Sequence, residues 1–234
     1  IWDDHDYGPN DTDQTFEGKN VSLKLFQNYW ANPSYGTPDT PSIFTHFRWA
    51  DAEFFLLDDR YYRSPNKSEH PDHFLGEAQL EWLKEALRKS TATFKLIAIG
   101  NQALNSYHAG VENYPHFKKE HDAFLNWLAQ ERIEGIVFLS GDRHHTEFLK
   151  LERPNLYPLY EYTSSPLTSK PKMKKKEMNN PLRVKGSWIY ERNFGLLKFH
   201  GSSQERILTL QTYDSNGKLL WDYHLPAHEL KLPS

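Results

Sequence analysis

Four consecutive titratable side chains near the start of the sequence could do chemistry. They are Asp3, Asp4, His5 and Asp6, within the segment WDDHDYGPND at residues 2–11. A carboxylate beside an imidazole supplies an oxygen ligand for a hard cation and a general acid, and a second carboxylate can fix the imidazole tautomer. The alternative is a hydrated acidic loop whose Asp and Asn side chains bind their own backbone. Composition alone leaves both interpretations open.

A second polar segment, FLSGDRHH at residues 138–145, follows a short apolar run. On an extended backbone, Asp142 and His144 would project to the same side of the chain. Such an Asp-x-His pair at the end of a strand can hold one or two cations. The alternative is a capped loop with a surface histidine.

The middle of the chain shows the hydrophobic periodicity of alternating strands and helices. Apolar runs predict strands at residues 47–57, 94–99 and 133–139, and amphipathic patterns predict helices at 77–89 and 118–131. This alternation is typical of α/β proteins, in which loops after the strands carry functional residues. We therefore predict an α/β fold with the second polar segment at a strand end.

The two ends of the chain differ from this middle part. Residues 1–47 are rich in Gly, Pro, Asn, Asp and Thr, which predicts long loops around one short helix at 21–30. After residue 146 the pattern predicts only strands, at 157–163, 188–200, 207–213 and 218–224, with a hairpin turn at 214–217. We expect one domain over 1–234, with a loop-rich part (1–47), an α/β part (48–145) and a β-rich part (146–228).

Charge and composition exclude several classes of protein. The 28 Lys and Arg against 31 Asp and Glu give a net charge of −3, so we expect no general attraction to nucleic acid. No apolar run approaches the ~20 residues that cross a bilayer, so no transmembrane segment is expected. The sequence contains no cysteine, and any metal would therefore be held by oxygen and imidazole ligands.

Taken together, the two polar segments resemble those of the alkaline phosphatase D family, the PhoD-like branch of the calcineurin-like metallophosphoesterases. Three further pieces occur in the family's order: FFLLDDR at 54–60, the helix start with Leu75-Gly76, and IGNQ at 99–102. The resemblance implies layered β-sheets flanked by helices (αββα). It also implies hydrolysis of phosphate mono- or diesters at a two-metal site on loops at strand ends.

The resemblance also assigns roles to individual residues. Asp4 would be a metal ligand, His5 would protonate the departing alkoxide or contact the transferring phosphoryl group, and Asp6 would orient His5. Asp142 and His144 would be metal ligands. Two metal ions are implied, from among Fe, Ca, Mn, Mg and Zn, and an oxygen ligand in place of one imidazole favours the harder cations.

Substrate contacts are expected from Arg60, Arg143 and Asn101, since arginine binds phosphate oxygens in a bidentate fork. Ion pairing with Asp58 or Asp59 is the alternative for Arg60. The substrate would be a phosphorylated small molecule or a lipid or polymer phosphoester. The Lys-rich stretch 170–185 is either an electropositive lip for such a substrate or a solvated loop.

The family's first two metal motifs should precede the WDDH segment, yet only Ile1 stands before it. The resemblance therefore implies the C-terminal part of a longer enzyme, with the N-terminal part of the same protein as its partner. The alternative is a non-catalytic remnant that binds phosphate or cations. By family analogy we expect a secreted bacterial protein of the periplasm or cell surface.

Overall fold

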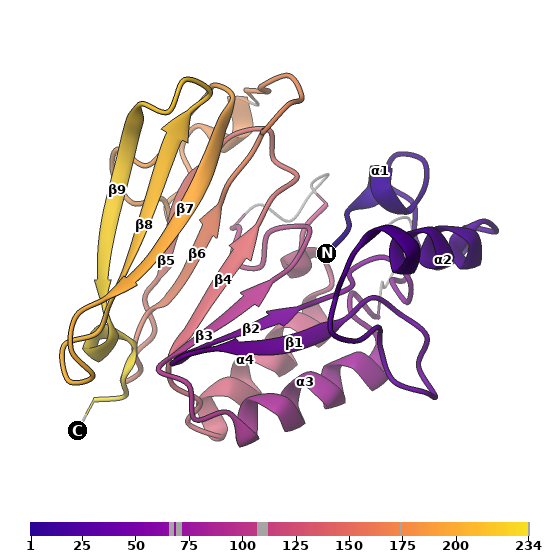
Figure 1. Cartoon of the computed structure of the whole chain (residues 1–234), viewed down its shortest axis with the longest axis horizontal. Coiled ribbons are helices and arrows are strands. Elements are labelled where there is room, and N and C mark those ends of the chain that lie inside the picture. The colour runs from indigo at the N-terminus through magenta and orange to yellow at the C-terminus, as the bar shows by residue number, and fades with distance from the viewer. Residues whose placement is uncertain (66–67, 69–71, 107–111, 174, 234) are drawn as a thin grey trace.

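A six-stranded sheet forms the centre of the computed structural model, which describes residues 1–234 except 66–67, 69–71, 107–111, 174 and 234 (Figure 1). The strand order is β1-β2-β3-β4-β6-β5, in which β2, β3, β4 and β6 are parallel and the two edge strands are antiparallel. The strands are β1 (Thr45–Trp49), β2 (Ala52–Leu56), β3 (Phe94–Ala98), β4 (Ile136–Ser140), β5 (Glu147–Leu151) and β6 (Leu159–Thr163).

Two amphipathic helices cover one face of this sheet. Helix α3 (Glu77–Lys89) buries Leu80, Leu83 and Leu87, whose spacing places them on one side of the helix. Helix α4 (Lys118–Gln130) buries Phe124 and Leu128 in the same way. Because parallel strands need crossover connections, these helices join β2 to β3 and β3 to β4.

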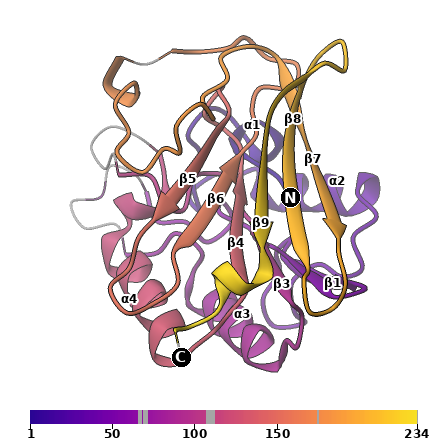
Figure 2. The ribbon, with the colours of Figure 1, turned by 90° about the vertical axis from the view of Figure 1, so that its left-hand side faces the viewer.

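A three-stranded antiparallel sheet packs against the opposite face, with strand order β7-β8-β9 (Figure 2). Its strands are β7 (Asn193–His200), β8 (Ile207–Asp214) and β9 (Leu219–Pro226). The rings of Trp221 and Tyr223 lie 5.6 and 4.8 Å from that of Phe148, so the core between the sheets is largely aromatic. The turn between β8 and β9 needs Gly217, whose φ is +81°.

The N-terminal segment has its own small core. It contains helices α1 (Asp4–Tyr7) and α2 (Lys19–Tyr29), which pack through Trp2, Tyr7 and Phe26. Three short 3₁₀ helices complete the structure: η1 (Tyr114–His116), η2 (Lys175–Glu177) and η3 (Ala227–Leu230). Within the described residues, no helix is long and apolar enough to span a membrane.

The α/β class and both long helices predicted from the sequence are confirmed. The single strand predicted over 47–57 is wrong, because the chain reverses at Ala50 (φ +53°) and forms the β1–β2 hairpin. Strand β5 was not predicted. With β6 it joins the six-stranded sheet, so residues after 146 contribute to both sheets.

Candidate active site

A cleft of about 880 Å³ lies where the two polar segments meet. Its lining residues are Asp3, Asp4, His5, Asp6, Asn10, Asp11, Glu112, His116, Asp142, Arg143, His144, the stretch 165–169 and Lys172. Six of the eight site residues predicted from the sequence are in this set. The two others, Arg60 and Asn101, are buried behind it.

A buried anchor fixes the first segment against the end of β2. The Trp2 indole N–H donates to Asp58 at 2.8 Å, and Trp2 is only 1% exposed. The other Asp58 oxygen accepts from the Ser42 hydroxyl at 2.6 Å. Helix α1 follows directly, so its acidic side chains are held at a strand end.

Hydrogen bonds to backbone amides orient the carboxylates of α1. The oxygens of Asp4 accept from the backbone N–H groups of His5 at 2.7 Å and Asp11 at 3.1 Å. Asp6 accepts from the Asp3 backbone N–H at 3.2 Å. No hydrogen bond between described residues joins Asp6 to the His5 ring, so Asp6 closes the first turn. The role predicted for Asp6, orienting the His5 ring, therefore has no supporting contact between these two side chains.

Three acidic side chains form a candidate cation site. Asp4, Asp11 and Glu112 each place one carboxylate oxygen within 4.8 Å of the others. Such a cluster of oxygen donors is suited to a hard cation. Glu112 comes from a loop more than 100 residues away in sequence, so the long-range fold assembles this group.

The second segment has a different backbone from the one expected. Asp142 and His144 adopt positive φ angles of 64° and 56°, so this loop is left-handed at two positions and not extended. Non-glycine residues rarely adopt this conformation, although Asp and His tolerate it better than most. Both side chains still face the same cleft, because these kinks reverse the chain after β4.

The imidazole of His144 is held through one nitrogen. Its Nδ1 lies 2.7 Å from the carbonyl oxygen of Lys170, which can only accept a hydrogen bond. Nδ1 therefore carries the proton in the neutral ring, and the Nε2 lone pair is left available. A neutral histidine with a hydrogen-bonded Nδ1 is a common arrangement for a metal ligand.

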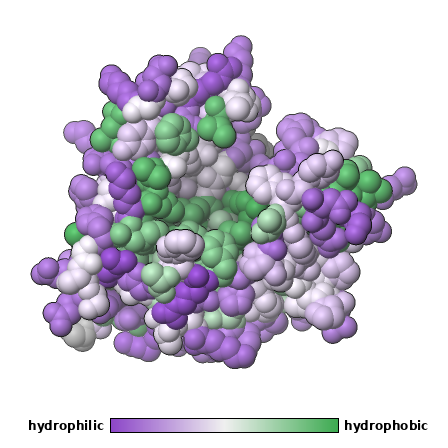
Figure 3. Space-filling model, viewed as in Figure 1, coloured by the Kyte–Doolittle hydropathy of each residue, from purple (hydrophilic) through white to green (hydrophobic). Residues whose placement is uncertain are grey.

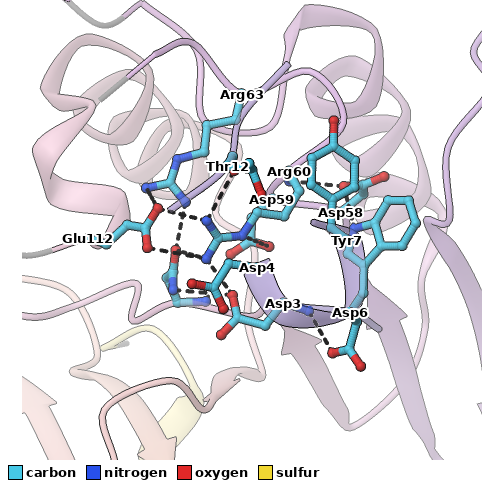
Figure 4. A network of polar contacts seen from close by, with 12 residues as sticks. Asp3, Asp4, Asp6, Tyr7, Thr12, Asp58, Asp59, Arg60, Arg63 and Glu112 are labelled. Atoms are coloured by element: carbon cyan, nitrogen blue, oxygen red, sulfur yellow. Dashed lines mark hydrogen bonds and ion pairs between the residues drawn. The ribbon is translucent and has the colours of Figure 1, made fainter. Parts of the chain in front are cut away.

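Arg60 lies in a buried network of charges behind the cleft (Figure 4). Its guanidinium binds Asp3 and contacts Glu112 at 2.7 Å. Burial alone would lower the pKa of Arg60, but the surrounding carboxylates raise it above its ordinary value. Arg63 lies beside it, 2.8 Å from Glu112, and donates to the Asn101 side-chain oxygen at 2.8 Å.

This network corrects two predictions. Arg60 and Asn101 were expected to bind substrate, but both are fully buried. The terminal nitrogens of Arg60, and the backbone N–H and side-chain oxygen of Asn101, are bound to protein partners. Arg60 forms ion pairs, which was the alternative prediction for this residue. Its close partners are Asp3 and Glu112, whereas Asp59 lies 3.9 Å away. The two residues thus position the acidic groups of the cleft.

Arg143 lines the cleft but is anchored from behind. Its guanidinium binds Glu177 and contacts Asp142 at 3.3 Å. Glu177 belongs to the Lys-rich stretch, and Lys172 from the same stretch donates its backbone N–H to the His144 carbonyl at 3.0 Å. This stretch is therefore attached to the second segment, and one of its lysines reaches the cleft.

Negative charge dominates the cleft. Six carboxylates line it, whereas Arg143 and Lys172 are its only Arg or Lys residues among the described parts of the chain. Burial raises the pKa of Asp3, opposed by Arg60 and reinforced by the carboxylates of Asp59 and Asp142. A cation would relieve this crowding. The donors, all oxygen or imidazole, fit hard or borderline metal ions.

Comparisons with known proteins agree with this arrangement. The profile of the PhoD-like phosphatase family matches residues 1–211. The chain belongs to the PhoD-like phosphatase family. Among curated proteins, no sequence matches it.

Two solved structures show how this PhoD-like chain folds. One, described as the structure of PhoD, aligns with a TM-score of 0.68 at 17% sequence identity. The alignment covers 92% of this chain and 48% of the PhoD chain. The other, a purple acid phosphatase (PPD1) from yellow lupin (Lupinus luteus) seeds, aligns with a TM-score of 0.55 at 11% sequence identity. That alignment covers 97% of this chain and 42% of the phosphatase chain. The fold is thus the predicted metallophosphoesterase fold. The chain spans less than half the length of either neighbour.

Sequence reasoning missed several lining residues of this PhoD-like site. Asp3 and Asp11 lie in the recognised segment, and their acidic type was the available signal. Glu112 and His116 stand in no motif, so no local pattern indicates them. Ser165 is held at the cleft by its hydrogen bonds with the second segment, including the His144 backbone N–H at 3.0 Å.

Proposed function

We propose that this PhoD-like protein hydrolyses phosphate mono- or diesters with two metal ions bound in the cleft. The observation that carries the proposal is the convergence of six carboxylates and His144 on one cleft that holds only two strongly basic side chains. A phosphate anion would be repelled by this cleft unless cations were bound first. Family membership gives the reaction class that such a site would serve.

The chain offers two groups of metal ligands. Asp4, Asp11 and Glu112 form the first, since their oxygens already lie within 4.8 Å of one another. Asp142 and His144 form the second, with the Nε2 of His144 as its nitrogen donor. Metal ions in such a site supply Lewis acidity at the phosphoryl group.

His5 is our candidate for the general acid. It lies on α1 at the cleft, it is exposed, and its backbone N–H is fixed by Asp4 at 2.7 Å. An exposed imidazole at this place can reach the leaving oxygen of a bound ester and donate a proton to it. Arg143 and Lys172 would bind the nonbridging phosphate oxygens from the opposite wall.

We propose a phosphorylated small molecule or the phosphoester of a lipid or polymer as the substrate that enters this cleft of about 880 Å³.

The test uses the protein expressed from its complete gene and a series of phosphoesters. Replacing His5 with Ala should slow alkyl esters by about 10²- to 10⁴-fold and nitrophenyl esters much less, because nitrophenolate leaves without a proton. Asp142→Asn should lower metal content and activity together, whereas Asp39→Asn, at an exposed turn position, should change neither. Unchanged metal content and activity in the Asp142 variant would contradict the proposal.

A further inference from the structure

Helix α2 carries large apolar side chains on two of its sides. Leu23 and Phe26 are buried in the small N-terminal core, whereas Val21, Leu25 and Tyr29 face solvent. Because residues four apart lie on the same face of a helix, these three exposed side chains form a stripe, the α2 stripe. Val21 is 65% exposed and Tyr29 is 83% exposed. Figure 3 shows green at the right of the molecule, where Figure 1 places α2.

The same helix is basic within an acidic segment. Lys19 and Lys24 lie on α2 and are the only Lys or Arg residues among residues 1–47, which contain seven Asp and Glu residues. Trp30 follows the helix directly and is 53% exposed. Lysines, aliphatic side chains and exposed aromatic rings together are typical of helices that lie in the head-group region of a membrane.

A second exposed apolar patch lies on the other wall of the cleft. Leu167 lines the cleft and is 69% exposed, and Met173 and Tyr190 are also exposed. The Tyr190 hydroxyl donates to the carbonyl oxygen of Pro171 at 3.1 Å, which joins the two loops that carry these side chains. Leu167, Met173 and Tyr190 are called the loop patch below.

Unpaired positive charge occurs along the segment of the loop patch. Four of its lysines are exposed and form no ion pair with any residue that the structure describes: Lys170, Lys172, Lys175 and Lys185. The carboxylate of Glu177 is buried against Arg143, so Glu191 is the exposed acidic residue of positions 165–192. An excess of free lysines attracts anionic lipid head groups.

The α2 stripe and the loop patch lie on either side of the cleft. Helix α2 packs on the N-terminal segment through Phe26, whose ring lies 5.4 Å from that of Trp2, and α1 in that segment carries the cleft residue His5. Leu167 lines the cleft from the opposite wall. In Figure 1 and Figure 2, α1 lies between α2 and the orange segment that precedes β7. A flat partner in front of the cleft would therefore contact both surfaces.

We propose that the α2 stripe and the loop patch bind the surface of an anionic lipid bilayer, with the cleft facing the head groups. The inference concerns what the protein binds and does not depend on the proposed hydrolysis.

The combination of apolar and basic side chains favours this partner over two others. A soluble polyanion would engage the lysines but leave Leu25, Tyr29 and Leu167 in water, whereas a bilayer receives both kinds of side chain. A second copy of the chain would bring its lysines against lysines of the same sign, which disfavours association.

The experiment sediments the protein expressed from its complete gene with phosphatidylcholine vesicles that either contain or lack phosphatidylglycerol. We expect binding to the anionic vesicles, weakened by salt. Leu25→Asp and Leu167→Asp should each weaken it by about 10-fold or more, because each removes an apolar contact and adds negative charge at an anionic surface. The double variant Lys170→Gln with Lys175→Gln should weaken it similarly. Leu219→Asp, on β9 and 42% exposed, is the matched control and should bind as the parent does.

Circular dichroism of each variant checks that it is folded. A parent protein that does not bind anionic vesicles would overturn the proposal, and so would normal binding by both leucine variants. Loss of binding in the lysine variant alone would assign the surface to a soluble polyanion instead. Self-association without lipid that Leu25→Asp abolishes would assign it to a second copy.

Hydrolysis of a soluble nitrophenyl phosphoester separates this proposal from the proposed function. Leu25 lies outside the cleft, so Leu25→Asp should hydrolyse this ester at the rate of the parent while losing vesicle binding. A parent that binds vesicles but hydrolyses no phosphoester would contradict the proposed function and leave the bilayer surface standing.

Discussion

Different interactions hold the two walls of the cleft. On the wall of residues 2–11, buried charges do so: Arg60 lies fully buried against Asp3 and Glu112. On the wall of residues 141–145, the backbone itself is bent into the left-handed region at Asp142 and His144. The first wall is therefore sensitive to loss of charge, and the second to changes of backbone preference and of the Lys-rich stretch behind it.

The largest effect is expected at Arg60. Replacing it with Leu leaves Asp3 without its buried cation and leaves Glu112 with Arg63 alone. Breaking a buried ion pair from one side typically costs about 3–5 kcal/mol. Urea unfolding measures this loss. Arg88→Leu, which removes a surface ion pair with Glu131, is the control and should change stability much less. Equal effects of the two substitutions would contradict the role of buried charge in the first wall.

The next effect concerns acid stability at the base of the second wall. Burial alone would raise the pKa of Glu147, but His145, Arg183 and Gln102 outweigh it and lower the pKa to about 2. Since the folded pKa lies below the ordinary glutamate value of 4.5, this carboxylate stabilises the fold above about pH 4.5. The contribution, about 3 kcal/mol, is lost as the pH falls through about 2.

Glu147→Gln should therefore flatten the dependence of the unfolding free energy on pH between about 5 and 2. Chemical unfolding over this range measures the slope. Glu152→Gln, at the exposed position that follows β5, is expected to keep the steep slope of the parent. A parent protein whose stability does not change with pH in this window would disprove the assignment.

A smaller effect on stability, with a specific effect on binding, is expected at Glu177. Glu177→Gln removes the charge that anchors Arg143 and should cost about 1–3 kcal/mol. Inorganic phosphate should then inhibit about 10-fold more weakly, because the guanidinium is no longer held at the cleft. Glu191→Gln, an exposed glutamate of the same region, serves as the comparison. Loss of stability with normal phosphate inhibition would make Glu177 a purely structural residue.

The smallest effect on stability separates backbone strain from chemistry. Asp142→Gly should stabilise the fold by up to about 1 kcal/mol, because glycine adopts positive φ without strain, while activity is lost. Asn155→Gly removes similar strain at φ 58° away from the cleft and should leave activity intact. Thermal unfolding and phosphoester hydrolysis of the two variants make the comparison. Retained activity in Asp142→Gly would remove this residue from the ligand set.

Local pattern was enough to predict some elements and some site residues. The helices α3 and α4 follow from apolar spacing, and the turn ending at Gly217 follows from its residue types. The hairpin at Ala50 was missed because Trp49-Ala50-Asp51 lacks the glycine or asparagine that usually marks a tight turn. Asp142 and His144 do line one cleft, as predicted. The prediction assumed an extended backbone, however, whereas both residues adopt left-handed backbone angles.

The buried network could not be predicted because it depends on packing between distant segments. Arg60, Asn101 and Glu112 come from three separate loops. Arg60 and Asn101 stand in recognised sequence segments and Glu112 stands in none, but no local pattern indicates that the three side chains meet. Only the fold shows that the arginine is fully buried and therefore needs carboxylate partners rather than a substrate.

Metal content measured together with activity tests the central claim most directly. The protein from the complete gene would be stripped with a chelator, reloaded with one metal at a time, and assayed on phosphoesters alongside elemental analysis. We predict about two tightly bound cations per chain, no hydrolysis in the stripped protein, and recovery that follows metal content. Full hydrolysis by the metal-free protein, or two bound cations with no hydrolysis of any phosphoester, would contradict this account.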